Sequence, residues 1–177
     1  EEVDGKMDVV ISGATNAATT KPGWTTGVYT AGTNDAGGTG MQDDAKATVT
    51  VTVPDSTGAG GADETLTFDT AALANDATID QVIAAMKAST ATNANGDTVK
   101  LEDLYDITAT AGGEINLALK DGAEATVAGF AYTQDTGTIT GTDAKATLAA
   151  GAVVAAPADG NGHTPGGDFN VQTIEVT

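Results

Sequence analysis

"TIDQVIAAMKAS", at residues 78–89, carries the clearest helical pattern in this chain of 177 residues. Its apolar residues recur at positions i, i+3, i+4 and i+7, which gives a helix one apolar stripe that faces a core. The stripe consists of Ile79, Val82, Ile83 and Met86. Thr78 and Gln81 form a T-x-x-Q capping box, which fixes the start of the helix. The stretch therefore predicts one short amphipathic helix.

Alternating stretches on both sides of this helix predict antiparallel strands. In "KATVTVTV" at residues 46–53, valines alternate with other residues, and "ETLTFD" at residues 64–69 repeats the alternation, so the two predict a hairpin. "YDITATAGGEINLALK" at residues 105–120 predicts a second hairpin, with a tight two-residue turn at Gly112 and Gly113. The fold class predicted is α+β, mostly antiparallel β with one short amphipathic helix: a ββαββ-like unit plus flanking strands.

The flanks of this unit predict further strands. The strand-strand-helix-strand-strand unit spans residues 45–130, and the flanking segments 1–44 and 131–177 could together form one β-rich subdomain. Further strand-like stretches are "WTTGVYTAG", "ATVAGFAYTQ", "GTITGT" and "ATLAAGAVVAA". Gly, Asp and Pro separate these stretches, as turn residues do between strands.

Two more features concern the arrangement of the flanks. Residues 6–12, "KMDVVIS", and residues 171–176, "VQTIEV", are predicted to pair. This pairing would bring the chain ends together, as in a domain inserted into a loop of a larger protein. The sequence "DAKAT" occurs at residues 44–48 and again at residues 143–147, each time before a strand-like stretch. It predicts two similar strand entries.

Acidic residues dominate the charge. The formal net charge is −18, from 25 Asp and Glu against 7 lysines, and the sequence has no arginine. Because contacts with phosphate need a basic surface, this balance argues against nucleic acid and anionic membranes as partners. The absence of cysteine excludes disulfides and thiolate chemistry. Aromatic residues are only 4% and much of the hydrophobic content is alanine, which predicts a thin core.

The sequence offers no catalytic pattern. His163 is the only histidine, which excludes a zinc-peptidase H-E-x-x-H signature. A catalytic triad would need it beside Ser12, Ser56 or Ser89, and none of these serines lies in a G-x-S-x-G setting. The glycine-rich stretches lack the lysine of a phosphate-binding loop. We therefore predict that the chain is not an enzyme and assign no catalytic, cofactor-binding or metal-binding residue.

Calcium is the one cofactor that the many carboxylates leave open, but no ligand set is predicted for it. In "GGTGMQDDA", Gln42 occupies the position at which a calcium turn needs aspartate. The loop "DGNGHT" at residues 159–164 has Thr164 where an EF-hand needs glycine. The neighbouring carboxylates Glu102, Asp103 and Asp106 are interpreted as a solvated turn rather than an acid and base pair.

The central unit resembles a motif in the variable central region of bacterial flagellins, and in some flagellar hook-associated and cap proteins. The matching helix residues are Thr78, Ile79, Val82, Ile83, Ala85 and Met86, and the matching hairpin residues are Gly113, Ile115, Leu117 and Leu119. The match covers about half of the chain. The helical terminal regions through which flagellins polymerise are absent from this sequence, so the resemblance implies an outer domain rather than the filament core.

The resemblance implies a structural role at an extracellular location, the surface of the bacterial flagellum. Such a domain serves motility as part of a filament, and its partners are neighbouring copies of the same protein. The alternative is a binding module of a bacterial adhesin or surface-layer protein that recognises a glycan or a host surface. The only aromatic residues that such a module could use for glycan binding are Trp24, Tyr29 and Tyr132, and each is expected in the core instead.

Overall fold

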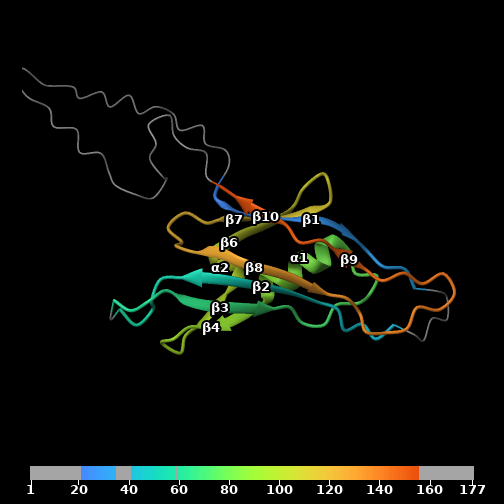
Figure 1. Cartoon of the computed structure of the whole chain (residues 1–177), viewed down its shortest axis with the longest axis horizontal. Coiled ribbons are helices and arrows are strands. Elements are labelled where there is room, and N and C mark those ends of the chain that lie inside the picture. Colours follow the sequence, from blue (N-terminus) through green and yellow to red (C-terminus); the bar gives the residue numbers. More distant parts are fainter. Residues whose placement is uncertain (1–20, 35–40, 59, 156–177) are drawn as a thin grey trace, which may run out of the picture.

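The computed structural model of the chain describes residues 21–34, 41–58 and 60–155. Within these residues, strands and two helices form a mostly antiparallel α+β fold, as the alternating patterns predict (Figure 1). The elements are β1 (Gly23–Thr30), β2 (Lys46–Val53), β3 (Glu64–Asp69), α1 (Ile79–Ala88), β4 (Thr90–Thr92), β5 (Thr98–Lys100), α2 (Leu101–Leu104), β6 (Tyr105–Ala109), β7 (Glu114–Leu119), β8 (Thr126–Thr133), β9 (Thr147–Leu148) and β10 (Ala152–Val154).

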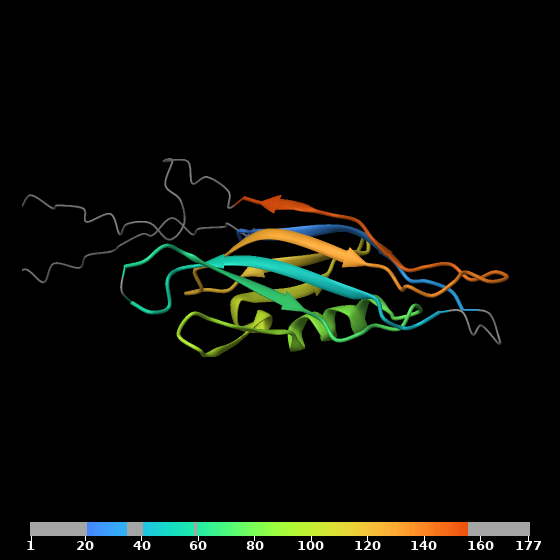
Figure 2. The same cartoon turned by 60° about the horizontal axis from the view of Figure 1, so that its bottom comes forward.

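The described strands form two main sheets and a small hairpin. The larger sheet has the order β10-β1-β7-β6, with β9 also paired to β1, and the smaller has the order β3-β2-β8. Among the described strands, β4 and β5 pair only with each other. Figure 2 shows β10 at one side of the molecule and α1 at the other. Every strand pair is antiparallel.

Helix α1 begins and ends where its sequence predicts. The backbone N–H of Thr78 donates to the Gln81 side chain at 2.7 Å, and the N–H of Gln81 donates to the Thr78 hydroxyl at 3.3 Å. Val82, Ile83 and Met86 are buried. The predicted capping box and apolar stripe are therefore both confirmed.

The core lies between the two sheets and is closed by α1. Alternate residues of the hairpins face inward, as a period of two requires. The fully buried large side chains include Tyr105, Phe68, Met86, Leu101, Ile107, Ile115, Leu117, Val49, Val51 and Val82. Alanines fill much of the remaining interior, with Ala45 and Ala47 completely buried. The core thus consists mainly of Val, Ile, Leu and Ala, with Phe68 and Tyr105 as its largest fully buried side chains.

Both predicted hairpins form, but one turn differs from its prediction. Strand β3 pairs with β2 along its full length, from Asp69 opposite Thr48 to Glu64 opposite Val53. In the β6–β7 hairpin, the N–H of Thr110 donates to the carbonyl of Glu114 at 2.9 Å, which leaves three residues in the loop. The predicted two-residue turn is therefore wrong.

The physical reason lies in the backbone of the two glycines. Of the pair, Gly113 alone has a positive φ, at 85°, and its N–H donates to the carbonyl of Thr110 at 3.1 Å. A turn followed by one left-handed glycine is the three-residue hairpin connection with a bulge. A two-residue turn of the type predicted would need positive φ at both central residues.

The flanks contribute strands to the same core. Strand β1 pairs with β7 along one edge and with β9 and β10 along the other. "GTITGT" at residues 137–142 was predicted as a strand and is a loop. The N–H and hydroxyl of Thr140 both donate to the Asp143 carboxylate, and Gly141 has a φ of 56°, so a turn replaces the ladder.

The repeated "DAKAT" segments do enter strands in similar ways. Ala45 forms an isolated bridge with Leu73, and Ala144 forms one with Thr33. Strands β2 and β9 follow these bridges. The predicted pairing of residues 6–12 with residues 171–176 lies outside the described residues. The division into a central unit and a flanking subdomain stays a prediction.

The packing of α1 predicts a large cost for shortening its central side chain. Met86→Ala removes a side chain with no exposed surface and leaves a cavity between helix and sheets. The free energy of unfolding should fall by about 2–5 kcal/mol. Urea denaturation followed by circular dichroism measures this change. Ala84→Lys, at an exposed position of the same helix, should change it by less than about 0.5 kcal/mol. Equal losses in both variants would contradict this packing.

Candidate functional site

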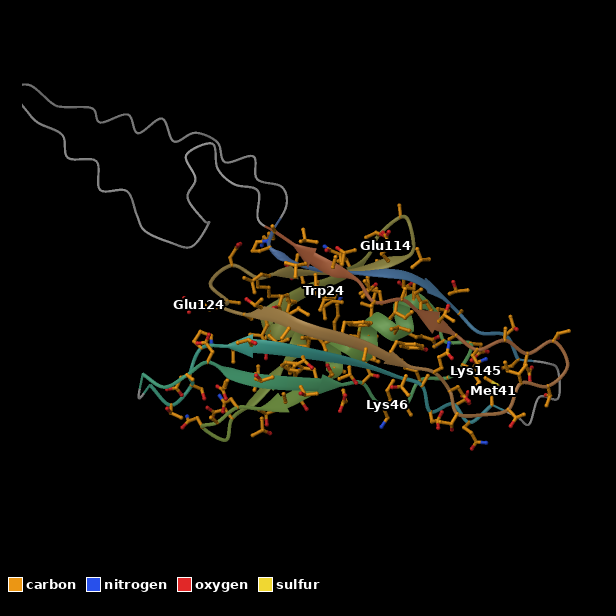
Figure 3. All side chains as sticks on the ribbon, in the orientation of Figure 1. Trp24, Met41, Lys46, Glu114, Glu124 and Lys145 are labelled. Carbon is orange, nitrogen blue, oxygen red and sulfur yellow. The ribbon has the colours of Figure 1, made fainter. Side chains whose placement is uncertain are left out.

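The densest group of buried polar side chains lies at one end of the fold, where three loops meet. These are the described parts of the β1–β2 loop (residues 31–34 and 41–45), the β3–α1 loop (70–77) and the β8–β9 loop (135–146). We call them the loop end; Lys145 and Met41, labelled in Figure 3, lie there. Asn75 and Asp135 are almost completely buried there. Buried polar side chains either serve a site or satisfy the backbone. Their partners decide between these two roles.

Asn75 joins loops that are far apart in the sequence. Its side-chain N–H₂ donates to the carbonyl of Ala144 and to the Asn34 side chain, both at 2.9 Å. Its side-chain oxygen accepts from the N–H of Ala146 at 3.0 Å, and its own carbonyl accepts from Gly32 at 2.9 Å. A Cβ at Gly32 would lie 2.4 Å from the Asn75 amide, so the close approach requires glycine.

Asp135 is a second acceptor of backbone N–H groups. Its carboxylate accepts from Gln42 at 2.9 Å, from Asp43 at 2.5 Å and from Gly137 at 2.6 Å. Burial raises the pKa of the Asp135 carboxyl, but these hydrogen bonds outweigh it and hold the pKa below its usual range. The Nζ of Lys145 donates to the Asp135 carbonyl. The carboxylate is therefore fully used in holding the loops.

The neighbouring carboxylates have the same use. The N–H and the hydroxyl of Thr136 donate to Asp44, and the hydroxyl is the main cause that lowers the pKa of this carboxyl. The N–H of Asn75 donates to Asp43 at 3.1 Å. In the part of the chain that the structure describes, no three His, Cys, Asp or Glu side chains are grouped to hold a metal ion. The loop end is thus built as a structural network.

Hollows on the described surface include a groove and a smaller slot. A groove of about 390 Å³ is lined by Lys87, Glu102, Tyr105, Asp106, Ile107, Thr108 and Lys120. A smaller apolar slot of about 170 Å³ is lined by Pro22, Gly23, Tyr105, Ala125, Thr126, Val127, Val153, Val154 and Ala155. The ion-paired side chains of the groove are about half-exposed: Lys120 lies 3.9 Å from Asp106, and Glu102 lies 3.1 Å from Lys100, which is outside the groove. Such pairs are typical of a solvated surface.

The serines and carboxylates weighed in the sequence have structural partners. The hydroxyl of Ser89 donates to the carbonyl of Met86 at 2.6 Å and ends α1. The hydroxyl of Ser56 accepts from the N–H of Asn95. The Asp103 side chain accepts from the N–H of Lys100 at the start of α2. Ser12, His163 and Thr164 lie outside the described residues.

The aromatic side chains lie in or beside the core. Tyr29 is buried, and its hydroxyl donates to the carbonyl of Ala77 at 2.6 Å. Tyr132 meets it edge to face, with ring centroids 6.3 Å apart. Trp24 lies near the middle of the molecule in Figure 3, with its indole nitrogen buried. None of the three forms the flat exposed platform that a sugar ring needs.

Burial also changes the ionisation of the tyrosines. Desolvation raises the pKa of Tyr105, whose hydroxyl is buried without a hydrogen-bond partner among the described residues. Desolvation, and then electrostatic coupling to Tyr29, raises the pKa of Tyr132. The pKa of Tyr29 is raised by burial as well. All three phenols therefore favour the neutral form in the folded state.

The chain matches no protein-family model, no curated protein and no solved structure. Among the described residues, no helix is long and apolar enough to cross a membrane. Local chemistry, the fold and the sequence resemblance are therefore the basis for proposing a function.

Neither of the two central residues of the loop end, Asn75 and Asp135, is singled out by a sequence pattern. Asn75 has no local signal, since its partners lie in other loops. Asp135 has one: it stands two residues before Gly137, and aspartate commonly accepts from the N–H two residues on in a turn. The D-T-G sequence could have identified that turn, but not the contacts with Gln42 and Asp43.

The structural role of Asn75 predicts that removing its side chain destabilises the fold. Asn75→Ala leaves the N–H of Ala146 without its buried partner, and leaves the carbonyl of Ala144 with the N–H of Thr33 but without the Asn75 amide. The free energy of unfolding should fall by at least about 2 kcal/mol. Asn95→Ala, at an exposed turn, should lower it by less than about 1 kcal/mol. Chemical denaturation measures both changes, and a neutral Asn75→Ala would refute the structural role.

The tyrosine environments predict alkaline unfolding. Because the folded pKa values lie above the unfolded value of about 10, the neutral phenols stabilise the fold fully below that pH. This stabilisation is lost as the pH rises toward the folded pKa values. Tyrosinate absorbance at 295 nm should therefore appear together with loss of circular dichroism, above pH 10. In urea the three tyrosines should titrate near about pH 10. Titration near pH 10 in a folded chain would contradict the prediction.

Proposed function

We propose that this chain is a structural, solvent-exposed outer domain of a bacterial flagellar filament subunit. It would lie at the flagellum surface, outside the cell, and contribute to motility through the properties of the filament surface. Its partners would be neighbouring copies of the same protein. The proposal includes no chemistry and no cofactor.

The position of the two ends of the described fold is the observation that carries this proposal. Gly23 pairs with Val154, so the chain enters and leaves the fold side by side (Figure 1). A domain attached through two adjacent strands can project from a larger protein without disturbing its fold. This arrangement, together with the resemblance of the α1 and β6–β7 segments to flagellin insert motifs, supports an outer domain.

The surface chemistry agrees with the same role. The net charge of −18 keeps the exposed surface hydrated and makes free copies repel one another. Threonines occupy the outward positions of β2 and β3, where β-branched residues favour strands without adding an apolar surface. The buried carboxylates of the loop end hold backbone N–H groups, which supports a structural rather than a catalytic use.

Labelling of whole cells tests the proposal. Antibodies raised against residues 21–155 should decorate flagella along their length in immunogold electron microscopy of cells that encode the chain. Mechanical shearing removes flagella, so it should also remove most of the antigen from the cells. Antibodies against an unrelated outer-surface protein of the same cells serve as the control for shearing.

The alternative function gives a different labelling pattern. An adhesin or surface-layer module would be labelled over the cell body and would stay with the cells after shearing. That outcome would overturn the flagellar proposal. Binding of the purified chain to glycan arrays or host cells would then be the next measurement.

A further inference from the structure

The outer edge of β10 differs from the rest of the surface in its lack of charge. The two longest stretches without a charged residue or histidine are residues 22–34 and residues 146–158. The first contains β1 and the second contains β9 and β10, and these strands pair with one another. One border of the larger sheet is therefore uncharged, although the whole chain carries a net charge of −18.

The hydrogen-bond pattern shows which backbone groups this border presents. The N–H of Leu119 donates to the carbonyl of Pro22, directly before β1. Every second residue of an antiparallel strand bonds to the same neighbour, so the next residue that bonds to β7 is Trp24, opposite Leu117. The residues between them, Gly23 and Thr25, therefore point their backbone N–H and carbonyl groups toward β10. Val153, opposite Trp24, points its own N–H and carbonyl away from β1. Within the described residues, no strand pairs with that side of β10.

The side chain at this position is also unusual. Val153 is 62% exposed, the most exposed of the large hydrophobic residues in the described part of the chain. It lies on the same side of the sheet as Trp24, its partner in the register, and lines the apolar slot beside Val127. An apolar side chain at an open strand edge is a surface that association would cover.

The other strand borders have charge or neighbours. The outer strand of the smaller sheet, β3, carries Glu64 and Asp69. Strand β6 packs against α1, and β8 lies against β1. Charges and covering elements are the usual means by which proteins keep strand edges from pairing. The β10 edge has neither among the described residues.

We propose that β10 pairs antiparallel with β10 of a second copy of this chain, with Val153 on the two-fold axis. In this arrangement the N–H and carbonyl of Val153 bond to the same groups of the second copy, and Gly151 faces residue 155. A strand that pairs with itself in this way makes a closed, symmetric contact. The uncharged stretch around it is where two acidic copies meet with the least repulsion.

The inference rests on the proposed function, because a filament holds its copies side by side. Strand β10 has only three residues, so the contact is far smaller than a stable interface of about 1,200–2,000 Å². Free copies should associate weakly and neighbouring copies in a filament much more, since a fixed neighbour has a high effective concentration. The same contact is measurable in solution by trapping it covalently.

Cysteine cross-linking of the full 177-residue chain tests the pairing, since the sequence has no cysteine of its own. Directly bonded residues of an antiparallel pair have Cα atoms about 5.5 Å apart, within the range of about 4.4–6.8 Å for a disulfide. In a glutathione redox buffer, Val153→Cys should form dimers at least about tenfold faster than Ala84→Cys. Ala84 is an exposed residue of α1, and Figure 2 shows this helix on the opposite side of the molecule from β10.

Salt and a backbone substitution refine the test. Raising salt from about 0.01 M to about 1 M shortens the Debye length from about 30 Å to about 3 Å, so both cysteine variants should cross-link faster, and Val153→Cys should remain the faster of the two. In NMR dilution series, the amides of Gly151 and Val153 should shift with concentration. Val153→Pro removes the outward N–H without breaking the bonds to β1, and should abolish the shift at Gly151. Val153→Thr keeps that N–H and should retain the shift.

The outcomes separate this inference from the proposed function. Equal cross-linking rates for Val153→Cys and Ala84→Cys would overturn the pairing, whatever the antibodies label. Loss of the dilution shifts in both Val153→Pro and Val153→Thr would also overturn it, because side-chain contact alone would then explain the association. Fast cross-linking without labelled flagella would retain the self-pairing and overturn the filament role. Circular dichroism of each variant checks that the monomer remains folded.

Discussion

The packing of α1 against the two sheets is the interaction on which the rest of the structure depends. With few aromatic residues available, the hairpins bury mainly valine, isoleucine, leucine and alanine, and the helix supplies Val82 and Met86 to close their shared core. The hydroxyl of Tyr29 donates to the carbonyl of Ala77, directly before the helix, and so ties β1 to it. The segment that leads into the helix also carries Asn75, so the position of α1 and the order of the loop end are coupled.

Most of the central unit could be predicted from the sequence because its signals are local. The alternation at Val49 and Val51 specifies a strand, and Thr78 with Gln81 specifies where the helix begins. The pairing of strands into sheets could not be predicted in this way. The pairing of Trp24 with Leu117 joins residues 93 positions apart, and no periodicity within either strand selects that partner. Patterns define elements, whereas packing of the whole chain selects their neighbours.

The loop end shows the same limit for polar residues. The sequence around Asp135 indicates a turn, yet its hydrogen bonds to Gln42 and Asp43 become possible only after three loops meet. Residues 137–142 have the alternation of a strand, but Asp143 accepts the N–H of Thr140 and the ladder is lost. Aspartate and asparagine can satisfy backbone groups in this way, and a pattern of apolar residues does not record them. The small β4–β5 hairpin is not predicted either, because its strands have three residues each, which is too short for a period of two to stand out.

The distribution of charge connects the fold to the proposed role. Acidic residues lie within β3, β6 and β7 and in most of the described loops, where they favour hydration and oppose pairing of free copies. The longest uncharged stretches are distant in sequence, but β1 and β10 bring them together at one border of the larger sheet. If the border were as acidic as the remaining surface, two copies held side by side would repel through their closest strands. With Val153 at that border, copies held side by side in the proposed filament could pair, whereas isolated copies would associate only weakly.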